Sequence, residues 1–172
     1  MGNVLNISKK GKAFKFGDNI STDHIAPGRL FHLRSNLQEF AKHVLEDADA
    51  EFASKMSEGD FVVAGNNFGL GSSREHAPQI IKIAGVGAVL AKSFARIFYR
   101  NAINIGLLLI ECDTDGIDAG DELEIDVKAG LVRNLTKNIQ IEITPLPDVM
   151  IKLLEEGGLI EHIKKHGDFE LV

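Results

Sequence analysis

The sequence predicts an α/β fold in a chain of 172 residues, a length that suits one domain. From residue 60 to residue 110, short apolar runs alternate with segments of helical periodicity, as in strands joined by crossover helices. From residue 121 to residue 143, short runs of alternating apolar and polar residues follow one another, as in an antiparallel meander. We therefore expect a mixed, layered sheet in a single domain that covers residues 1–172.

The first third of the chain has few periodic segments and many turn residues. Alternation in Ala-Phe-Lys-Phe favours a strand, and Asn36 or Ser35 precedes a helical pattern as a candidate N-cap. The elements expected here are a strand over 13–16, a loop over 17–27, a helix over 36–47 and a short helix or turn over 48–57.

The middle of the chain carries three apolar runs of the kind found in strands that are buried on both faces. Gly85 and Gly87 break the helical pattern between the first two runs. The expected order is a strand over 60–64, a helix over 75–84, a strand over 88–91, a helix over 94–104 and a strand over 107–110.

The last third predicts the meander and two short helices. Gly157 and Gly158 separate the helices, as glycines do at a helix C-terminus. The expected strands cover 121–127, 131–135 and 139–143, and the expected helices cover 147–156 and 159–166.

Composition excludes several classes of function. The net charge of −6 and the lack of a basic patch argue against a nucleic-acid partner. The longest apolar run, residues 103–110, is too short to span a membrane. The single cysteine, Cys112, excludes an internal disulfide, indicates a reducing compartment such as the cytoplasm, and cannot by itself hold an iron–sulfur cluster or a cysteine zinc site.

The segment Gly65–Pro78, with sequence GNNFGLGSSREHAP, contains many polar residues and connects an expected strand to an expected helix. Ser72 and Glu75 match a capping box, which requires no function. Arg74 in the first turn opposes the helix dipole, so it instead favours a bound carboxylate. The glycine spacing matches neither a dinucleotide motif, a P-loop nor a nucleophile elbow. A cap and an anion site are compatible, and both interpretations stay open.

Other candidate residues are weaker. The Asp23-His24 pair could form an oriented imidazole, or the hydroxyls and carboxylates around it could simply make local turn bonds. Arg29 and Arg34 lie on a loop with apolar neighbours, and each alone suits the surface. The residues expected to be solvated are Arg96 and Arg100 on one helix and His43, His162 and His166 on others. Whether His32, on the same loop as Arg34, is a surface residue or a functional one stays open at this point.

Four ordered segments, GDNISTDH, HLRS, GNNFGLGSSREHAP and KSFARIFYRNAINIGLLLI, together resemble the small subunits of the 3-isopropylmalate dehydratase and homoaconitase family. They also resemble the fourth, swivelling domain of aconitase. The resemblance implies a β/β/α swivelling domain with a mixed sheet. It also implies a large partner subunit that holds a [4Fe–4S] cluster through three cysteines, so that this chain has no activity alone.

The implied reaction is dehydration and rehydration of a small hydroxy acid, which moves a hydroxyl between adjacent carbons. In leucine biosynthesis this converts 2-isopropylmalate to 3-isopropylmalate. By the family motif, Ser72 matches the base that removes the proton from carbon, and Ser73 and Arg74 match contacts to substrate carboxylates. Asp23 and His24 are supporting candidates.

Arg34 bears on the substrate, because the family contacts the variable arm of the substrate with the loop around it. Arg34 favours a carboxylate arm, as in homocitrate or homoaconitate, because a cation buried against an isopropyl group is costly. His32 and Ser35 depart from the Tyr and Thr of the homoaconitase pattern, so isopropylmalate stays open. A different class, a non-catalytic carboxylate-binding module, also fits the helix start. We expect the loop over residues 18–36 to be mobile before a partner docks.

Overall fold

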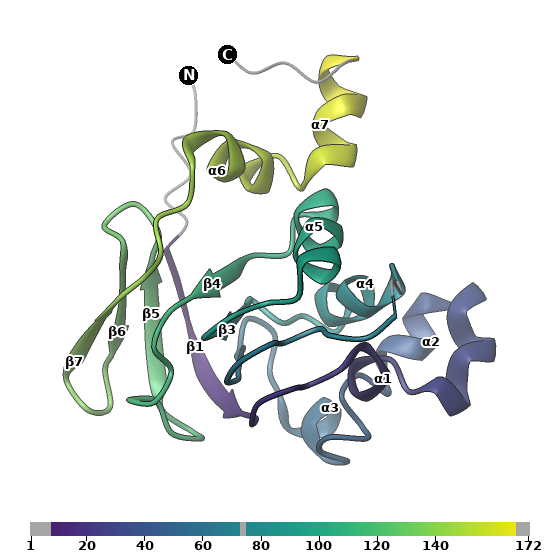
Figure 1. Ribbon diagram of the computed structural model, residues 1–172, viewed down its shortest axis with the longest axis horizontal. Helices are drawn as coiled ribbons and strands as arrows, with labels where there is room; N and C mark the ends of the chain where they lie inside the picture. Colours follow the sequence, from purple (N-terminus) through teal and green to yellow (C-terminus); the bar gives the residue numbers. More distant parts are fainter. Residues whose placement is uncertain (1–7, 73–74, 168–172) are drawn as a thin grey trace.

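A computed structural model of the chain describes residues 8–72 and 75–167. Its strands are β1 (Ser8–Lys15), β2 (Phe61–Val63), β3 (Ala88–Ala91), β4 (Leu109–Glu111), β5 (Glu122–Asp126), β6 (Leu131–Asn134) and β7 (Ile139–Glu142). Its helices are α1 (Thr22–Ile25), the 3-10 helix η1 (Gly28–Ser35), α2 (Leu37–Ala41), α3 (Phe52–Lys55), α4 (His76–Ile83), α5 (Arg96–Ile105), α6 (Asp148–Glu155) and α7 (Leu159–His166). Figure 1 shows the antiparallel strands at the left, α1 and α2 at the right, and α6 and α7 at the top.

The strands form one mixed sheet in the order β4-β3-β2-β1-β5-β6-β7. The long strand β1 joins its two halves, because residues 13–15 pair in parallel with β2 and residues 8–12 pair antiparallel with β5. The pairs from β1 to β4 are parallel and those from β5 to β7 antiparallel. A bridge between Cys112 and Ile143 brings the two ends of the sheet together. The sheet is therefore curled.

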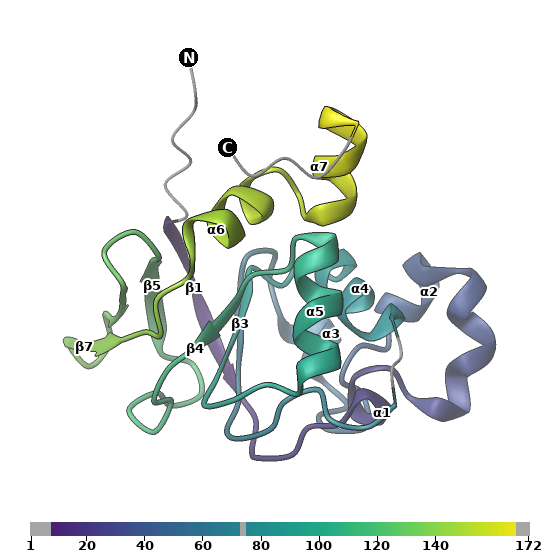
Figure 2. The same cartoon turned by 45° about the horizontal axis from the view of Figure 1, so that its top comes forward.

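Two cores separate three layers, and they follow the alternation of side chains along the parallel strands. Val62 in β2 packs on the side of the helices, in a cluster that includes Phe40 and Phe98. Its neighbours Phe61 and Val63 face a second cluster, shared with buried side chains of β5 and β6. The β/β/α arrangement expected from the sequence is confirmed, and Figure 2 shows α5 standing over the parallel strands.

The helix expected over residues 36–47 is shorter than the apolar pattern indicates. Asn36 caps it as expected, since its side chain accepts a hydrogen bond from the Glu39 N–H at 3.2 Å. However, α2 ends at Ala41 and turns follow to residue 48. Leu45 takes a left-handed φ of +57°, and its N–H donates to the Ile25 carbonyl at 3.0 Å. A long-range bond thus replaces the helical one.

The segment expected to be a loop over residues 17–27 contains the single turn α1. Ser21 caps this turn in a capping box: its hydroxyl accepts from the His24 N–H at 3.2 Å, and the His24 side chain accepts from the Ser21 N–H at 2.9 Å. Histidine takes the place of the usual Glu or Gln in this motif, which is why the sequence pattern did not predict a helix here.

The two C-terminal helices match the expected ranges closely, but one residue on them was misjudged. His162 was expected on the surface, yet it is 1% exposed, because α7 packs on α5 and faces Glu156. A close backbone approach fixes this packing: a Cβ on Gly158 would lie 2.5 Å from the Asn104 carbonyl oxygen. Among the described residues, no helix combines the length and apolar character needed to cross a membrane.

Candidate functional site

The candidate site lies where the loops that follow β1, β2 and β3 come together. These strands are parallel neighbours, so their carboxyl ends lie at one edge of the sheet, and the loops beyond them are adjacent. The loop after β1 spans residues 16–21 and leads into α1. The loop after β2 begins at residue 64 and leads toward α4, and that after β3 spans residues 92–95.

Hydrogen bonds from backbone N–H groups to polar side chains hold the three loops together. The Asp18 carboxylate accepts from the Asn66 N–H at 2.6 Å, and the Ser93 hydroxyl accepts from the Asn67 N–H at 2.7 Å. A side chain on Gly65 would overlap the Asp18 carboxylate. The backbone at the start of the glycine-rich segment is therefore tied to the loops after β1 and β3.

Ser72 lies on the surface of this edge, beside the buried Thr22 of α1. Their hydroxyl oxygens are 3.4 Å apart, and Thr22 is 3% exposed. The Thr22 N–H also donates to the Leu70 carbonyl at 2.8 Å. Between them, Gly71 has a φ of +113°, and a Cβ there would lie 3.1 Å from the Thr22 hydroxyl. Glycine at 71 thus permits the close approach of the two hydroxyls.

The sequence pattern did not predict the role of Thr22. Local turn bonds were one of two interpretations of the hydroxyls near Asp23, whereas the Thr22 hydroxyl contacts a residue 50 positions away. No local sequence pattern predicts a contact between two hydroxyls so far apart in the chain. It follows from topology, because β1 and β2 are parallel neighbours and their loops must meet.

The His24 imidazole is oriented by Ser21. Its Nδ1 lies 2.9 Å from both the Ser21 N–H and the Ser21 hydroxyl oxygen. Because the backbone N–H donates to Nδ1, a neutral His24 carries its proton on Nε2. Asp23 accepts from the Gly28 N–H at 3.0 Å, at the start of η1. The pair thus joins two adjacent turns.

Arg34 lies at the end of η1, folded back over its own turn. Its guanidinium sits 4.4 Å from the Phe31 ring centroid, and it donates to the Phe31 carbonyl at 3.1 Å. Within the described part of the chain, no carboxylate forms an ion pair with Arg34. The cation is exposed and held at one place by the aromatic ring.

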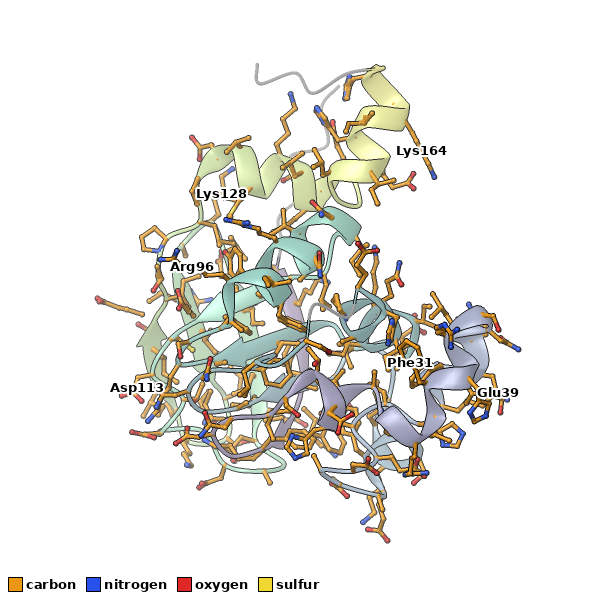
Figure 3. All side chains as sticks on the ribbon, turned by 45° about the vertical axis from the view of Figure 1, so that its right-hand side comes forward. Phe31, Glu39, Arg96, Asp113, Lys128 and Lys164 are labelled. Carbon is orange, nitrogen blue, oxygen red and sulfur yellow. The ribbon has the colours of Figure 1, made fainter. Side chains whose placement is uncertain are left out.

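Phe31 connects this loop to the start of α4. Its ring contacts the His76 imidazole, with centroids 5.5 Å apart, and His76 also packs on the buried Phe40 at 5.6 Å. Figure 3 shows Phe31 on the side of the molecule that carries α2. The Arg34 cation and His76 at the start of α4 are therefore linked through the Phe31 ring, and neither Phe31 nor His76 was among the residues that the sequence singled out.

The capping box expected at Ser72 and Glu75 does not start α4. The helix begins at His76 with Glu75 in the N-cap position, and no side-chain hydrogen bond caps it there. Pro78 explains the later start, because a proline is tolerated in the first turn but not one turn further in. Ser73 and Arg74 lie outside the described residues.

Several other expected surface residues are on the surface. Arg96 and Arg100 are exposed. Arg29 pairs with Glu46 at 3.0 Å and with Asp47 at 2.9 Å, and these hydrogen bonds raise the pKa of its guanidinium.

A hollow of about 450 Å³ lies beyond the carboxyl ends of β3 and β4, next to the end of β7. Its charged lining consists of Lys92, Glu111, Asp113, Asp115 and Glu142. Lys92 is paired with Asp115 at 2.6 Å, so the remaining charge is negative. Such a lining repels a carboxylate substrate, and Figure 3 shows Asp113 well away from Phe31.

The one cysteine of the chain does not suit an iron–sulfur cluster. Cys112 is buried, and desolvation raises the pKa of its thiol to about 12. A cluster needs several thiolates, and the sequence contains one cysteine. No step that depends on a cluster can be assigned to the residues of this chain.

Comparison with known proteins gives a consistent result. The family model of the aconitase C-terminal domain matches residues 10–115. A protein of Archaeoglobus fulgidus named 3-isopropylmalate dehydratase small subunit 2 is 65% identical over 94% of this chain and 98% of its own length. A Thermotoga maritima protein named 3-isopropylmalate dehydratase small subunit 1 is 61% identical over 95% of this chain and 99% of its own.

A solved structure has the same fold. It is described as the 3-isopropylmalate dehydratase of Methanocaldococcus jannaschii, and it aligns with a TM-score of 0.88 and 46% identity over 93% of this chain and 95% of its own. The three-layer fold of this chain is thus that of a solved protein at high identity.

Proposed function

Because the chain belongs to the aconitase C-terminal domain family, in the group of 3-isopropylmalate dehydratase small subunits, we propose that it is the small subunit of a hydro-lyase that isomerises 2-isopropylmalate to 3-isopropylmalate. The observation that carries the proposal is the exposed Ser72 hydroxyl, held 3.4 Å from the buried Thr22 hydroxyl at the carboxyl edge of the parallel strands. We propose that residues 1–172 act as one domain.

Ser72 is proposed to remove the proton from the carbon next to the carbinol in the dehydration half of the reaction. A serine needs its alkoxide stabilised to act as a base, and hydrogen bonds and nearby positive charge provide this. Thr22 can donate its hydroxyl proton toward Ser72. Ser73 and Arg74, which follow Ser72 in the sequence, are proposed to bind substrate carboxylates, and Asp23 and His24 of α1 are proposed as supporting residues.

The active enzyme is proposed to be a complex of this chain with a large subunit. Membership of the aconitase family indicates an iron–sulfur cluster in the active enzyme, and a single buried thiol does not suit a cluster. We therefore propose that the cluster is a [4Fe–4S] cluster on the large subunit, and that this chain supplies the base and the substrate contacts. Within residues 8–72 and 75–167 no carboxylate pairs with Arg34, and we propose that this edge faces the large subunit.

Arg34 supports a second substrate candidate, a hydroxy acid whose variable arm ends in a carboxylate, such as homocitrate. Its guanidinium is exposed and makes no ion pair within the described residues, so it is available to an anion. The neighbouring Phe31 ring is 39% exposed and offers an apolar wall to an isopropyl arm. The same loop thus presents both surfaces, and which arm it selects is a matter for assay.

The test is turnover by the reconstituted complex with a panel of substrates. We expect dehydration of 2-isopropylmalate with a cognate large subunit and none with this chain alone. Arg34→Val should raise the ratio of kcat/KM for 2-isopropylmalate over homocitrate, because it removes a cation and adds apolar wall. No turnover of either acid would contradict the proposed reaction. Tight binding of citrate by the isolated chain would instead indicate a carboxylate-binding module.

A further inference from the structure

Glu156, His162 and His166 form a compact cluster between the end of α6 and α7. The Glu156 carboxylate bonds the His162 Nδ1 with one oxygen and the His166 Nε2, at 2.9 Å, with the other. The two imidazole centroids are 4.5 Å apart. The sequence suggested only surface histidines here, so the convergence of three polar groups needs its own explanation.

The helix creates this convergence. His162 and His166 are four residues apart on α7, so their side chains leave the same face of the helix. Glu156 precedes the helix, and the turn at Gly157 and Gly158 brings its carboxylate back over that face. The same i, i+4 spacing of two histidines on one helix supplies two zinc ligands in other proteins.

The donor atoms are close to the spacing that a tetrahedral ion requires. One ligand atom from each residue lies within 4.8 Å of the other two. Zinc bonds of about 2.0–2.1 Å place ligand atoms about 3.3 Å apart in a tetrahedron. The ligand atoms therefore lie at most about 1.5 Å farther apart than this spacing.

Burial and charge suit a divalent cation. His162 is 1% exposed, while the Glu156 and His166 side chains are 13% and 29% exposed, so the cluster opens to solvent on one side. The Glu156 carboxylate, which is bonded to both imidazoles, supplies the acidic ligand of the cluster. Two histidine imidazoles and one carboxylate are a common zinc ligand set, with the fourth position left to water.

We propose that Glu156, His162 and His166 bind one zinc ion through a carboxylate oxygen and two imidazole nitrogens. The site is separate from the candidate active site, because α7 lies at the opposite end of the molecule from α1 (Figure 1). Zinc at this position ties the end of α6 to α7, which packs on α5. Its effect is therefore on the attachment of the C-terminal helices, and it needs neither a large subunit nor a substrate.

The test is calorimetric titration of zinc chloride into the full chain, freed of any affinity tag and treated with a chelator. We expect one saturable site and a zinc-dependent rise in Tm. His166→Ala should weaken zinc binding at least about tenfold, because even the loss of a group that only orients a ligand costs about 10- to 100-fold. Glu156→Gln keeps the size of the side chain and should also weaken zinc binding. Because two different ligands are replaced, a folding defect in one variant would not by itself decide the result.

His43→Ala is the matched control. His43 also bonds a glutamate, Glu46, through Nδ1 at 2.9 Å, but Arg29 occupies that carboxylate as well and repels a cation. This variant should bind zinc as the wild type does. The proposal is overturned by the absence of saturable binding, by a loss of less than about tenfold in His166→Ala, or by an equal loss in His43→Ala.

Discussion

The Thr22–Ser72 contact predicts a measurable loss of rate when only one oxygen atom is removed. Thr22→Val keeps the branched shape of a side chain that is 3% exposed and deletes the hydroxyl that lies 3.4 Å from Ser72. Ser72 is on the surface and can bond to water instead, so no polar group is left buried without a partner. The change therefore tests orientation and charge stabilisation, with little effect on folding.

The magnitude follows from the geometry of the contact. A hydroxyl pair at 3.4 Å is longer than the usual O–H···O distance, so it belongs at the modest end of hydrogen bonds. A net contribution of about 0.5–1.5 kcal/mol, if realised in the transition state, corresponds to a loss of about two- to tenfold in kcat. KM should change little, because Thr22 is buried and is not proposed to contact the substrate.

The assay compares steady-state dehydration of 2-isopropylmalate by complexes that contain wild type, Thr22→Val or Thr114→Val. Thr114 is 1% exposed, and its hydroxyl donates at 2.7 Å to the carbonyl of Ala64, the first residue of the loop after β2. Thr114→Val should lower Tm, since it leaves a buried carbonyl unsatisfied at a cost of about 1–3 kcal/mol, and should retain kcat. Wild-type kcat in Thr22→Val, or equal losses of kcat in both variants, would refute the reasoning.

Two further predictions concern packing and the thiol. Gly158→Ala should lower Tm by at least about 5 °C, because a φ of +108° and the backbone contact near Asn104 both exclude a side chain. Gly120→Ala is the control, since Gly120 has a φ of +87° but open space around it, and its Tm should fall by less. Equal losses of Tm in the two variants would contradict the packing argument. Cys112 has its pKa raised to about 12 by burial, so stability linked to it is present below the ordinary thiol pKa and is lost as pH rises toward 12. Alkylation at pH 8 should therefore be much slower in the folded chain than in denaturant, and equal rates would contradict burial of the thiol.

Elements whose ends are set by local chemistry were predicted closely. The strand over Ala88–Ala91 matches the expected range, because its four buried apolar residues lie between Gly87 and the polar residues Lys92 and Ser93. The helix over Leu159–His166 also matches, because glycines lie at both of its ends. In contrast, the helix after Asn36 was predicted too long, since the bond from Leu45 to the Ile25 carbonyl is a tertiary feature that no local pattern contains.

The candidate site divides in the same way. Gly65–Pro78 was identified from composition alone, and the structure brings Ser72 to the edge where the loops after the parallel strands meet. The partner hydroxyl of Thr22 could not be identified from the sequence, because 50 residues separate it from Ser72. Phe31 and His76 were missed for the same reason, since their contact depends on how η1 packs against α4.

The central proposal, that Ser72 is the base of a hydro-lyase completed by another subunit, is tested most directly by one substitution in the assembled enzyme. The measurement is kcat for dehydration of 2-isopropylmalate by the reconstituted complex with Ser72→Ala, alongside gel filtration to establish that the complex has formed. Since Ser72 is exposed, the variant should assemble as the wild type does. We expect turnover to fall at least about a hundredfold, in line with loss of a general base. An assembled Ser72→Ala complex that turns over at the wild-type rate would contradict the account.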